Sequence, residues 1–123
     1  AFAEKNGYVK TIFNRRIYIP ELKMKSSNMV FFGRRVAYNA PIQGSAADII
    51  KLAMINLNSR LSAEKLASKI ILQVHDEIIV HAPKEEQEQV VAILRNEMET
   101  VLSLAVPLQV VVGCGASWCS AKI

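Results

Sequence analysis

The sequence predicts an α+β fold, in which helices accompany an antiparallel sheet. Two β-forming apolar runs, 69–74 and 78–82, are separated by only a few polar residues. Segments with apolar residues at helical spacing lie before and after this pair. The expected order is hairpin, two helices, hairpin, helix and strand, and it is typical of α+β folds with helices and strands grouped separately.

Length and composition are those of a folded globular chain. The chain has 123 residues, of which 51% are hydrophobic, enough for one domain or for a piece of a larger one. No apolar run reaches the length of about 20 residues that crosses a bilayer. The N-terminus lacks the basic start and apolar stretch of a signal peptide. We therefore expect a cytoplasmic protein, nucleoid-associated if bacterial, with no membrane partner.

Positive charge is concentrated in the first part of the chain. Residues 1–51 contain nine Lys or Arg residues against three acidic residues, a net charge of +6, whereas residues 52–123 carry −2. A basic region of this kind favours a polyanionic partner such as nucleic acid. Composition alone leaves an ordinary basic surface as the alternative.

The first elements expected are a short hairpin and a helix. Alternation of apolar and polar residues over 8–19, around the turn 14–16, predicts the hairpin, and Pro20 ends it. A polar residue among 26–28 can cap a helix that runs to about Tyr38.

A helix break is expected at Ala40, because the following Pro41 disfavours helical angles there. Pro41 can open the next helix, although Ser45 and Asp48 also form a capping box one turn later. Free N–H groups near such a start would favour an anion. The inward face of this second helix is predicted to be Ile42, Ala46, Ile49, Ile50, Ala53, Leu57 and Leu61.

The remaining elements follow the second hairpin. Pro83 is expected to begin a third helix that runs to about Ser103, and Pro107 introduces a last strand, Leu108–Val112. A Gly-rich tail follows. The inward residues of the third helix are predicted to be Val90, Leu94, Met98, Val101 and Leu102.

The residues between the two long strands are His75, Asp76 and Glu77. Tight hairpin loops need positive φ, for which Gly or Asn is usual, and neither is present. Adjacent carboxylates repel each other unless a cation neutralises them, and Mg²⁺ typically uses one or two carboxylates plus water and substrate phosphates. The pattern suggests Asp76 as a metal ligand and Glu77 as a weaker one. A solvated polar turn is the alternative.

A second set of polar residues lies on the predicted helices. Arg35 and Asn39 share a helix face, and Gln43 lies just past the expected break. A guanidinium and two amides suit phosphates, sugars and base edges. A solvated helix face is again the alternative, and it is the default for Arg15 and Arg16.

Several segments resemble family A DNA polymerases, the family of bacterial DNA polymerase I. QVHDE between apolar strands resembles the third conserved motif of that family, and YNAPIQGSAADIIKLAM resembles the segment before it. GYVKTIFNRRIYIPEL resembles the stretch that follows the nucleotide-binding helix of the fingers. APK, VPLQVVVGCG and W-x-x-AK match the family's C-terminus. The resemblance covers nearly the whole chain in the same order. Single-subunit RNA polymerases share the His-Asp pair, but Glu77 favours the DNA enzymes.

The resemblance implies an antiparallel-sheet palm fragment, residues 35–123, with the last part of the fingers, residues 1–34. It implies a DNA-directed DNA polymerase, a nucleotidyltransferase of DNA replication or repair. The primer 3′-hydroxyl would attack the α-phosphate of a dNTP, and two Mg²⁺ ions would hold the reacting oxygens.

The resemblance also implies roles for individual residues at the positions that match the family's motifs. The resemblance implies that Asp76 is a catalytic, metal-binding carboxylate, that Glu77 is its acidic neighbour, and that His75 lies beside the primer terminus. Where the family usually has Glu before the matching Arg, this chain has Arg34. DNA primer-template contacts are implied for Arg35, Asn39 and Gln43, with Arg34, Arg15 and Arg16 as further basic residues of the DNA-binding set.

Two motifs of the family do not occur in this sequence: a DYSQIELR-like segment with the other metal-binding Asp, and the R-x-x-x-K-x-x-x-F-x-x-x-Y-G helix. We therefore expect the chain to need an upstream portion, on the same or a separate chain, and not to extend a primer by itself. Two alternatives stay open. One is a non-catalytic DNA-binding remnant or split subunit, and the other is a metal-dependent nuclease that uses Asp76 and Glu77.

Overall fold

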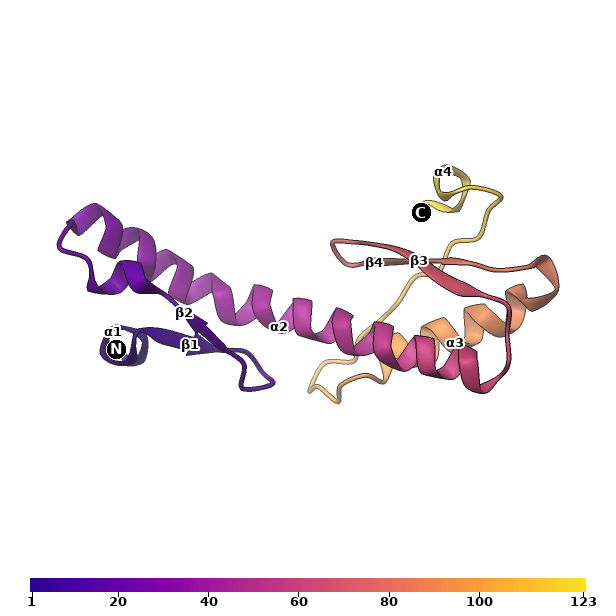
Figure 1. The fold of residues 1–123 in the computed structure, drawn as a ribbon, viewed down its shortest axis with the longest axis horizontal. Helices are drawn as coiled ribbons and strands as arrows, with labels where there is room; N and C mark the ends of the chain where they lie inside the picture. Colours follow the sequence, from indigo (N-terminus) through magenta and orange to yellow (C-terminus); the bar gives the residue numbers. More distant parts are fainter. The chain divides into compact units, whose positions relative to one another are not determined.

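The computed structural model describes all residues, 1–123, and divides them into two compact units, residues 1–48 and 49–123. The helices and strands mix as the sequence predicts, with two separate antiparallel pairs, so the α+β class is confirmed (Figure 1). In chain order the elements are α1 (Phe2–Asn6), β1 (Tyr8–Lys10), β2 (Arg16–Tyr18), the 3-10 helix η1 (Pro20–Lys23), α2 (Ser27–Ala63), β3 (Lys69–Val74), β4 (Glu77–His81), the 3-10 helix η2 (Lys84–Glu86), α3 (Gln87–Glu99) and α4 (Trp118–Ala121).

The first hairpin forms as predicted. β1 and β2 pair antiparallel, with Tyr8 opposite Tyr18 and Lys10 opposite Arg16. Asn14 in the turn has a φ of 62°, a left-handed conformation that Asn tolerates better than most residues. The short helix α1, which the sequence pattern did not reveal, ends at Gly7, where a φ of 77° suits glycine.

A small core holds the first unit together. It consists of Val9, Ile19 and Leu22, against which Val36 and Ala37 of α2 pack. Gly33 makes this packing close, because a Cβ at that position would lie 3.1 Å from the backbone nitrogen of Leu22. The missing side chain thus compensates for the poor helix propensity of Gly33.

The predicted helix break at Pro41 is wrong. α2 runs without interruption through Pro41, from Ser27 to Ala63. Proline removes one backbone hydrogen bond from a helix and crowds the preceding turn. It does not abolish a helix whose segments before and after the proline are both held by packing. The predicted inward face is correct only in its last part: Ala53, Leu57 and Leu61 are buried, whereas Ile42 is 73% exposed.

The second hairpin also forms within one residue of the predicted bounds. β3 and β4 pair antiparallel, from Lys69 opposite His81 to Val74 opposite Glu77. The register shifts between Ile70 and Leu72, where one extra residue bulges out of the ladder. His75 and Asp76 are left as a two-residue turn.

The core of the second unit joins α2, α3 and the second hairpin. Its buried residues are Leu57, Leu61, Val90, Ile93 and Leu94, and Ile70, Ile78 and Val80 of the hairpin pack against them. Ile93 was not among the predicted inward residues. α3 ends at Glu99 instead of Ser103, because the Thr100 backbone leaves the helical region and its hydroxyl donates to the Asn96 carbonyl oxygen. Val101 and Leu102 follow the helix, half-buried.

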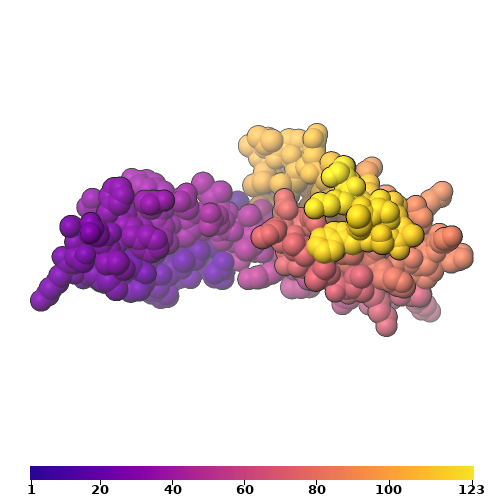
Figure 2. Space-filling view, turned by 90° about the horizontal axis from the view of Figure 1, so that it is seen from above, coloured from indigo at the N-terminus to yellow at the C-terminus, as the bar shows by residue number.

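The predicted strand Leu108–Val112 is absent. No strand backbone pairs with this segment, and the Val110 N–H donates instead to the Glu99 carboxylate at 2.9 Å. Val110 and Val112 still pack on the core of the second unit. Residues 113–120 are exposed and are visible in yellow in Figure 2. None of the helices combines the length and the apolar character needed to cross a membrane.

Candidate nucleic-acid interface

Arg35, Asn39 and Gln43 lie together on α2, although the sequence analysis placed a helix break between them. They line a shallow hollow of about 180 Å³ in the first unit. An unbroken helix puts residues three and four positions apart on one face, so the three polar groups follow one another along a single helix. The other residues that line the hollow are Phe32, Val36 and Ala40.

Phe32 is the residue of this hollow that the sequence analysis missed. Its side chain is half exposed. It stands three positions before Arg35 and seven before Asn39, so helical spacing could have revealed it. A guanidinium, two amides and an aromatic ring in one hollow can bind a phosphate, a base edge and a base or sugar face.

Arg34 does not line this hollow. Its Nε donates to the Glu4 carboxylate at 2.7 Å, and both side chains are partly exposed. Hydrogen bonds from the N-terminal amine and from Arg34 lower the pKa of Glu4 below its usual value. The ion pair links α1 to α2 inside the first unit.

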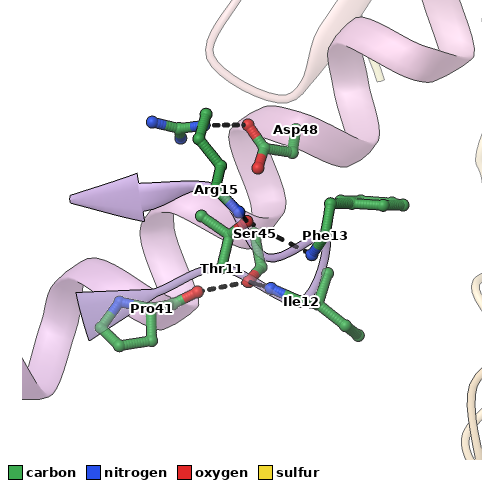
Figure 3. A network of polar contacts seen from close by, with 7 residues as sticks. All are labelled: Thr11, Ile12, Phe13, Arg15, Pro41, Ser45 and Asp48. Atoms are coloured by element: carbon green, nitrogen blue, oxygen red, sulfur yellow. Dashed lines mark hydrogen bonds and ion pairs between the residues drawn. The ribbon is translucent and has the colours of Figure 1, made fainter.

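Arg15 and Arg16 lie in or next to the turn of the first hairpin, and they have different partners. The Arg16 guanidinium lies over the Tyr8 ring, 4.6 Å from its centroid. The Arg15 Nε donates to Asp48 Oδ1 at 2.9 Å (Figure 3). Asp48 is only 11% exposed, whereas Arg15 is 47% exposed.

The hairpin turn is attached to α2 by further bonds (Figure 3). The Ile12 N–H donates to Ser45 Oγ at 2.9 Å, and the same hydroxyl donates to the Pro41 carbonyl oxygen. The backbone N–H groups of Phe13 and Arg15 reach Thr11 Oγ1, each at 3.3 Å. Hydrogen bonds therefore hold the turn together internally and attach it to α2.

The helix start predicted near Ser45 is wrong. Gly44, Ser45 and Asp48 lie inside α2, where backbone N–H groups are used by the helix itself. Ser45 and Asp48 bind the hairpin turn instead of capping a helix. The expected anion site at this place is therefore absent.

His75, Asp76 and Glu77 stand at the end of the second hairpin, and all three are exposed. His75 has a φ of 52°, so the turn takes its positive φ without Gly or Asn. The Gln73 side-chain amide donates to the His75 carbonyl oxygen at 2.5 Å, which ties the turn to its own strand.

The donor set at this turn limits what it can hold. No group of three or more His, Cys, Asp or Glu side chains is clustered anywhere in the chain. Asp76 and Glu77 therefore do not form an all-protein metal cage. Two adjacent exposed carboxylates do fit Mg²⁺, because this ion typically keeps several waters and takes further ligands from phosphates.

A known protein family matches nearly the whole chain. The model of "DNA polymerase family A" matches residues 1–120. DNA polymerase I of Bacillus caldotenax is 48% identical over 120 residues, and that of Caldicellulosiruptor bescii is 50% identical over 121 residues. Each match covers 98% of this chain. The chain spans only 14% of the length of these relatives.

A solved structure is similar to this chain in both fold and sequence. The POL domain of Pol1 from M. smegmatis, in complex with a DNA primer-template and dNTP, superposes with a TM-score of 0.96 and 44% sequence identity. The match covers 99% of this chain and 22% of that one. The expected resemblance to a polymerase fragment is thus confirmed for the fold.

Proposed function

Because the chain belongs to DNA polymerase family A, we propose that it is part of a DNA-directed DNA polymerase, a nucleotidyltransferase of DNA replication or repair. The complete enzyme would transfer a nucleotide from a dNTP to a primer 3′-hydroxyl, as the template directs. The observation that carries this proposal is the exposed His75-Asp76-Glu77 turn on a strand pair packed against a core. A hairpin supported in this way presents reactive groups more precisely than a free loop does.

Asp76 and Glu77 are the proposed catalytic and metal-binding carboxylates. They would hold Mg²⁺ jointly with the phosphates of the nucleotide and with carboxylates from outside this segment. Two bound Mg²⁺ ions would supply charge stabilisation at the reacting oxygens. His75, the first residue of the turn, would donate to a phosphate or sugar oxygen at the primer end.

Arg35, Asn39 and Gln43 are the proposed primer-template contacts of the first unit. Their shared hollow supports this role, since a charged donor and two amides stand in line on one helix. Arg34, Arg15 and Arg16 are peripheral members of the DNA-binding set. An Arg guanidinium has five N–H donors, so those that hold Glu4 or Asp48 through Nε keep further donors for a phosphate.

The segment would extend over two parts of the polymerase, with residues 1–34 in the fingers and 35–123 in the palm. The division of the chain at residues 48 and 49 concerns compactness and leaves that boundary a proposal. An upstream portion, on the same or a separate chain, would complete the enzyme.

The test of Asp76 uses a complete polymerase: the full-length chain that carries this segment, or Bacillus caldotenax DNA polymerase I with its matching 120 residues replaced. Asp76→Asn keeps the shape and removes the charge. We expect primer extension to fall by about a thousandfold or more, since a metal contributes several kcal/mol. DNA affinity should stay nearly unchanged. The exposed carboxylate of Glu85, changed to Gln, is the matched control.

The alternatives give other results. Unchanged extension by Asp76→Asn would identify a non-catalytic remnant. DNA degradation that requires Mg²⁺ but no dNTP, and that is lost in Asp76→Asn, would identify a nuclease.

Arg35→Ala tests the hollow separately. We expect DNA binding to weaken by about 1–3 kcal/mol, and the slope of log affinity against log salt to fall by about 0.9 if Arg35 contacts one phosphate. Lys51→Ala, another exposed cation of α2, is the control. Binding and salt slope that do not differ from the control would show that Arg35 is only solvated.

A further inference from the structure

The polar residues of the hollow span the weakest turn of α2. Pro41 lies between Asn39 and Gln43, and it has no N–H to donate to the Ala37 carbonyl oxygen. The pyrrolidine ring also crowds that carbonyl group. The orientation of Gln43 relative to Asn39 therefore depends on whatever else stabilises this turn.

The turn of the first hairpin supplies that support (Figure 3). Ser45 Oγ joins the Pro41 carbonyl oxygen to the Ile12 N–H, so one hydroxyl connects the helix turn after Pro41 to the hairpin. One turn further along α2, Asp48 holds Arg15. Just before Ser45, Gly44 lets the hairpin approach α2, because a Cβ there would lie 2.7 Å from Ile17 Cδ1.

Burial decides which partner of the ion pair depends on the other. The Asp48 side chain is nine-tenths buried, whereas nearly half of Arg15 is exposed. A carboxylate removed from water needs a counter-charge, and Arg15 provides it. Because Arg15 belongs to the hairpin and Asp48 to the helix, the pair fixes one against the other.

We propose that Arg15, Ser45 and Asp48 are positioning residues that hold the Pro41 turn of α2 and so orient Gln43 toward the primer-template. This inference rests on the proposed function, because it assigns the three residues a role through Gln43. Arg15 then acts by holding Asp48 and not through a phosphate contact of its own, which refines its peripheral place in the DNA-binding set.

The positioning role and a direct contact predict opposite results for one substitution. If Arg15 bound DNA directly, Asp48 would compete with the phosphate for Arg15, and Asp48→Asn would leave DNA affinity equal or higher. If the ion pair positions the helix, Asp48→Asn weakens DNA binding although it removes a negative charge. The sign of the change separates the two roles.

The experiment measures the equilibrium Kd for a primer-template, its salt dependence, and kcat and KM, in the complete polymerase. For both Asp48→Asn and Arg15→Gln we expect Kd and KM for DNA to rise about three- to tenfold, since a misplaced contact group loses part of its effect. The salt slope should not change, because no phosphate contact is lost. Ser45→Ala removes the hydroxyl that joins the Pro41 turn to Ile12 and leaves the ion pair intact, so it keeps the test decisive if Asp48→Asn folds poorly. It should raise Kd in the same direction.

A double-mutant cycle with Gln43→Ala shows whether Asp48 acts through Gln43. We expect the Asp48→Asn, Gln43→Ala double variant to bind DNA no more weakly than Gln43→Ala alone. A merely structural effect would add to the Gln43→Ala loss. The matched control is Glu64→Gln, which removes the other Arg–carboxylate pair of α2, Arg60 with Glu64 at 3.0 Å, and should change nothing.

Three results would overturn the proposal: an equal or lower Kd for Asp48→Asn, a reduced salt slope for Arg15→Gln, or losses that add in the cycle. Failure of the proposed function looks different. In that case Gln43→Ala and Arg35→Ala would themselves leave DNA binding unchanged. If both of those variants weaken binding and Asp48→Asn does not, only the positioning role is wrong.

Discussion

The two hairpins of the chain are anchored differently, one at its turn and the other at its base. The β1–β2 hairpin is attached at its turn, where Ile12 and Arg15 bind Ser45 and Asp48 of α2. The β3–β4 hairpin is attached at its base instead. There the Glu86 carboxylate accepts the backbone N–H groups of Ala67 and Ser68, at 2.9 and 3.0 Å, just before β3 begins.

We call the first a supporting hairpin, because its turn contacts α2. We call the second a presenting hairpin, because its turn stays exposed. Both turns contain a non-glycine residue with positive φ, Asn14 in the first and His75 in the second. In the first turn the polar groups are used for contacts with α2. In the second, Asp76 and Glu77 stay exposed while the strands behind them are fixed by packing and by the base. A hairpin whose turn stays exposed must be anchored away from that turn.

Gly44→Val should give the largest effect, because it pushes the first turn off α2. Its side chain would meet Ile17 and Thr11, and overpacking of this kind costs about 1–3 kcal/mol. Hydrogen exchange of the β1–β2 amides, measured in the complete polymerase, should become faster, while exchange in β3–β4 stays the same.

Ala47→Val is the control for Gly44→Val. Ala47 is exposed on the same helix, so the substitution loses only helix propensity, about 0.5 kcal/mol. Equal exchange in the two variants would mean that the first hairpin is not held at its turn.

Glu86→Gln should have a smaller effect, confined to the base of the second hairpin. Hydrogen bonds from the Ser68 hydroxyl and from the Ala67 and Ser68 N–H groups lower the pKa of Glu86 below its ordinary value of 4.5. A lowered pKa means that the carboxylate stabilises the fold above the unfolded-state pKa. This contribution is lost as pH falls through the lowered pKa of the folded state.

The measurement compares the hydrogen exchange of β3 in the native protein and in Glu86→Gln over a series of pH values. The native protein should be better protected than Glu86→Gln near pH 7, and the difference should shrink as pH falls below about 4.5. Glu88→Gln, an exposed neighbour, is the control. A difference that stays constant with pH would show that the charge of Glu86 is not what holds the base.

The strands and the exposed turn between β3 and β4 could be predicted from the sequence because their signals are local. Alternation predicted the first hairpin and two apolar runs predicted the second, and the HDE motif needed no knowledge of distant residues. Ser45 and Asp48 were noticed, but as a cap, since S-x-x-D has the same spacing in a helix interior and at its start. Only the contacts with the hairpin turn, more than 30 positions away in sequence, show what these residues do.

The failures have physical causes of the same kind. The local penalty at Pro41 is real, but the core of the first unit packs against α2 before the proline, and the hairpin binds Ser45 after it. The run Leu108–Val112 has strand composition, yet a strand exists only when another backbone pairs with it. Phe32 was missed because an apolar side chain at that spacing is equally typical of a core, and the sequence does not show that it stays half exposed in the hollow.

The substitutions His75→Gly and Asn14→Gly should give the smallest changes in stability, and together they compare the two turns directly. A left-handed residue other than Gly carries about 1–2 kcal/mol of strain, and Gly loses about 0.5–1 kcal/mol through the entropy of the unfolded chain. We therefore expect slower exchange in β3–β4, by about 0.5–1 kcal/mol, together with weaker primer extension. Asn14→Gly should change stability less, because Asn tolerates this conformation. Equal gains in stability at the two turns, with primer extension retained in His75→Gly, would contradict the presenting role. The strained conformation of His75 would then serve no function.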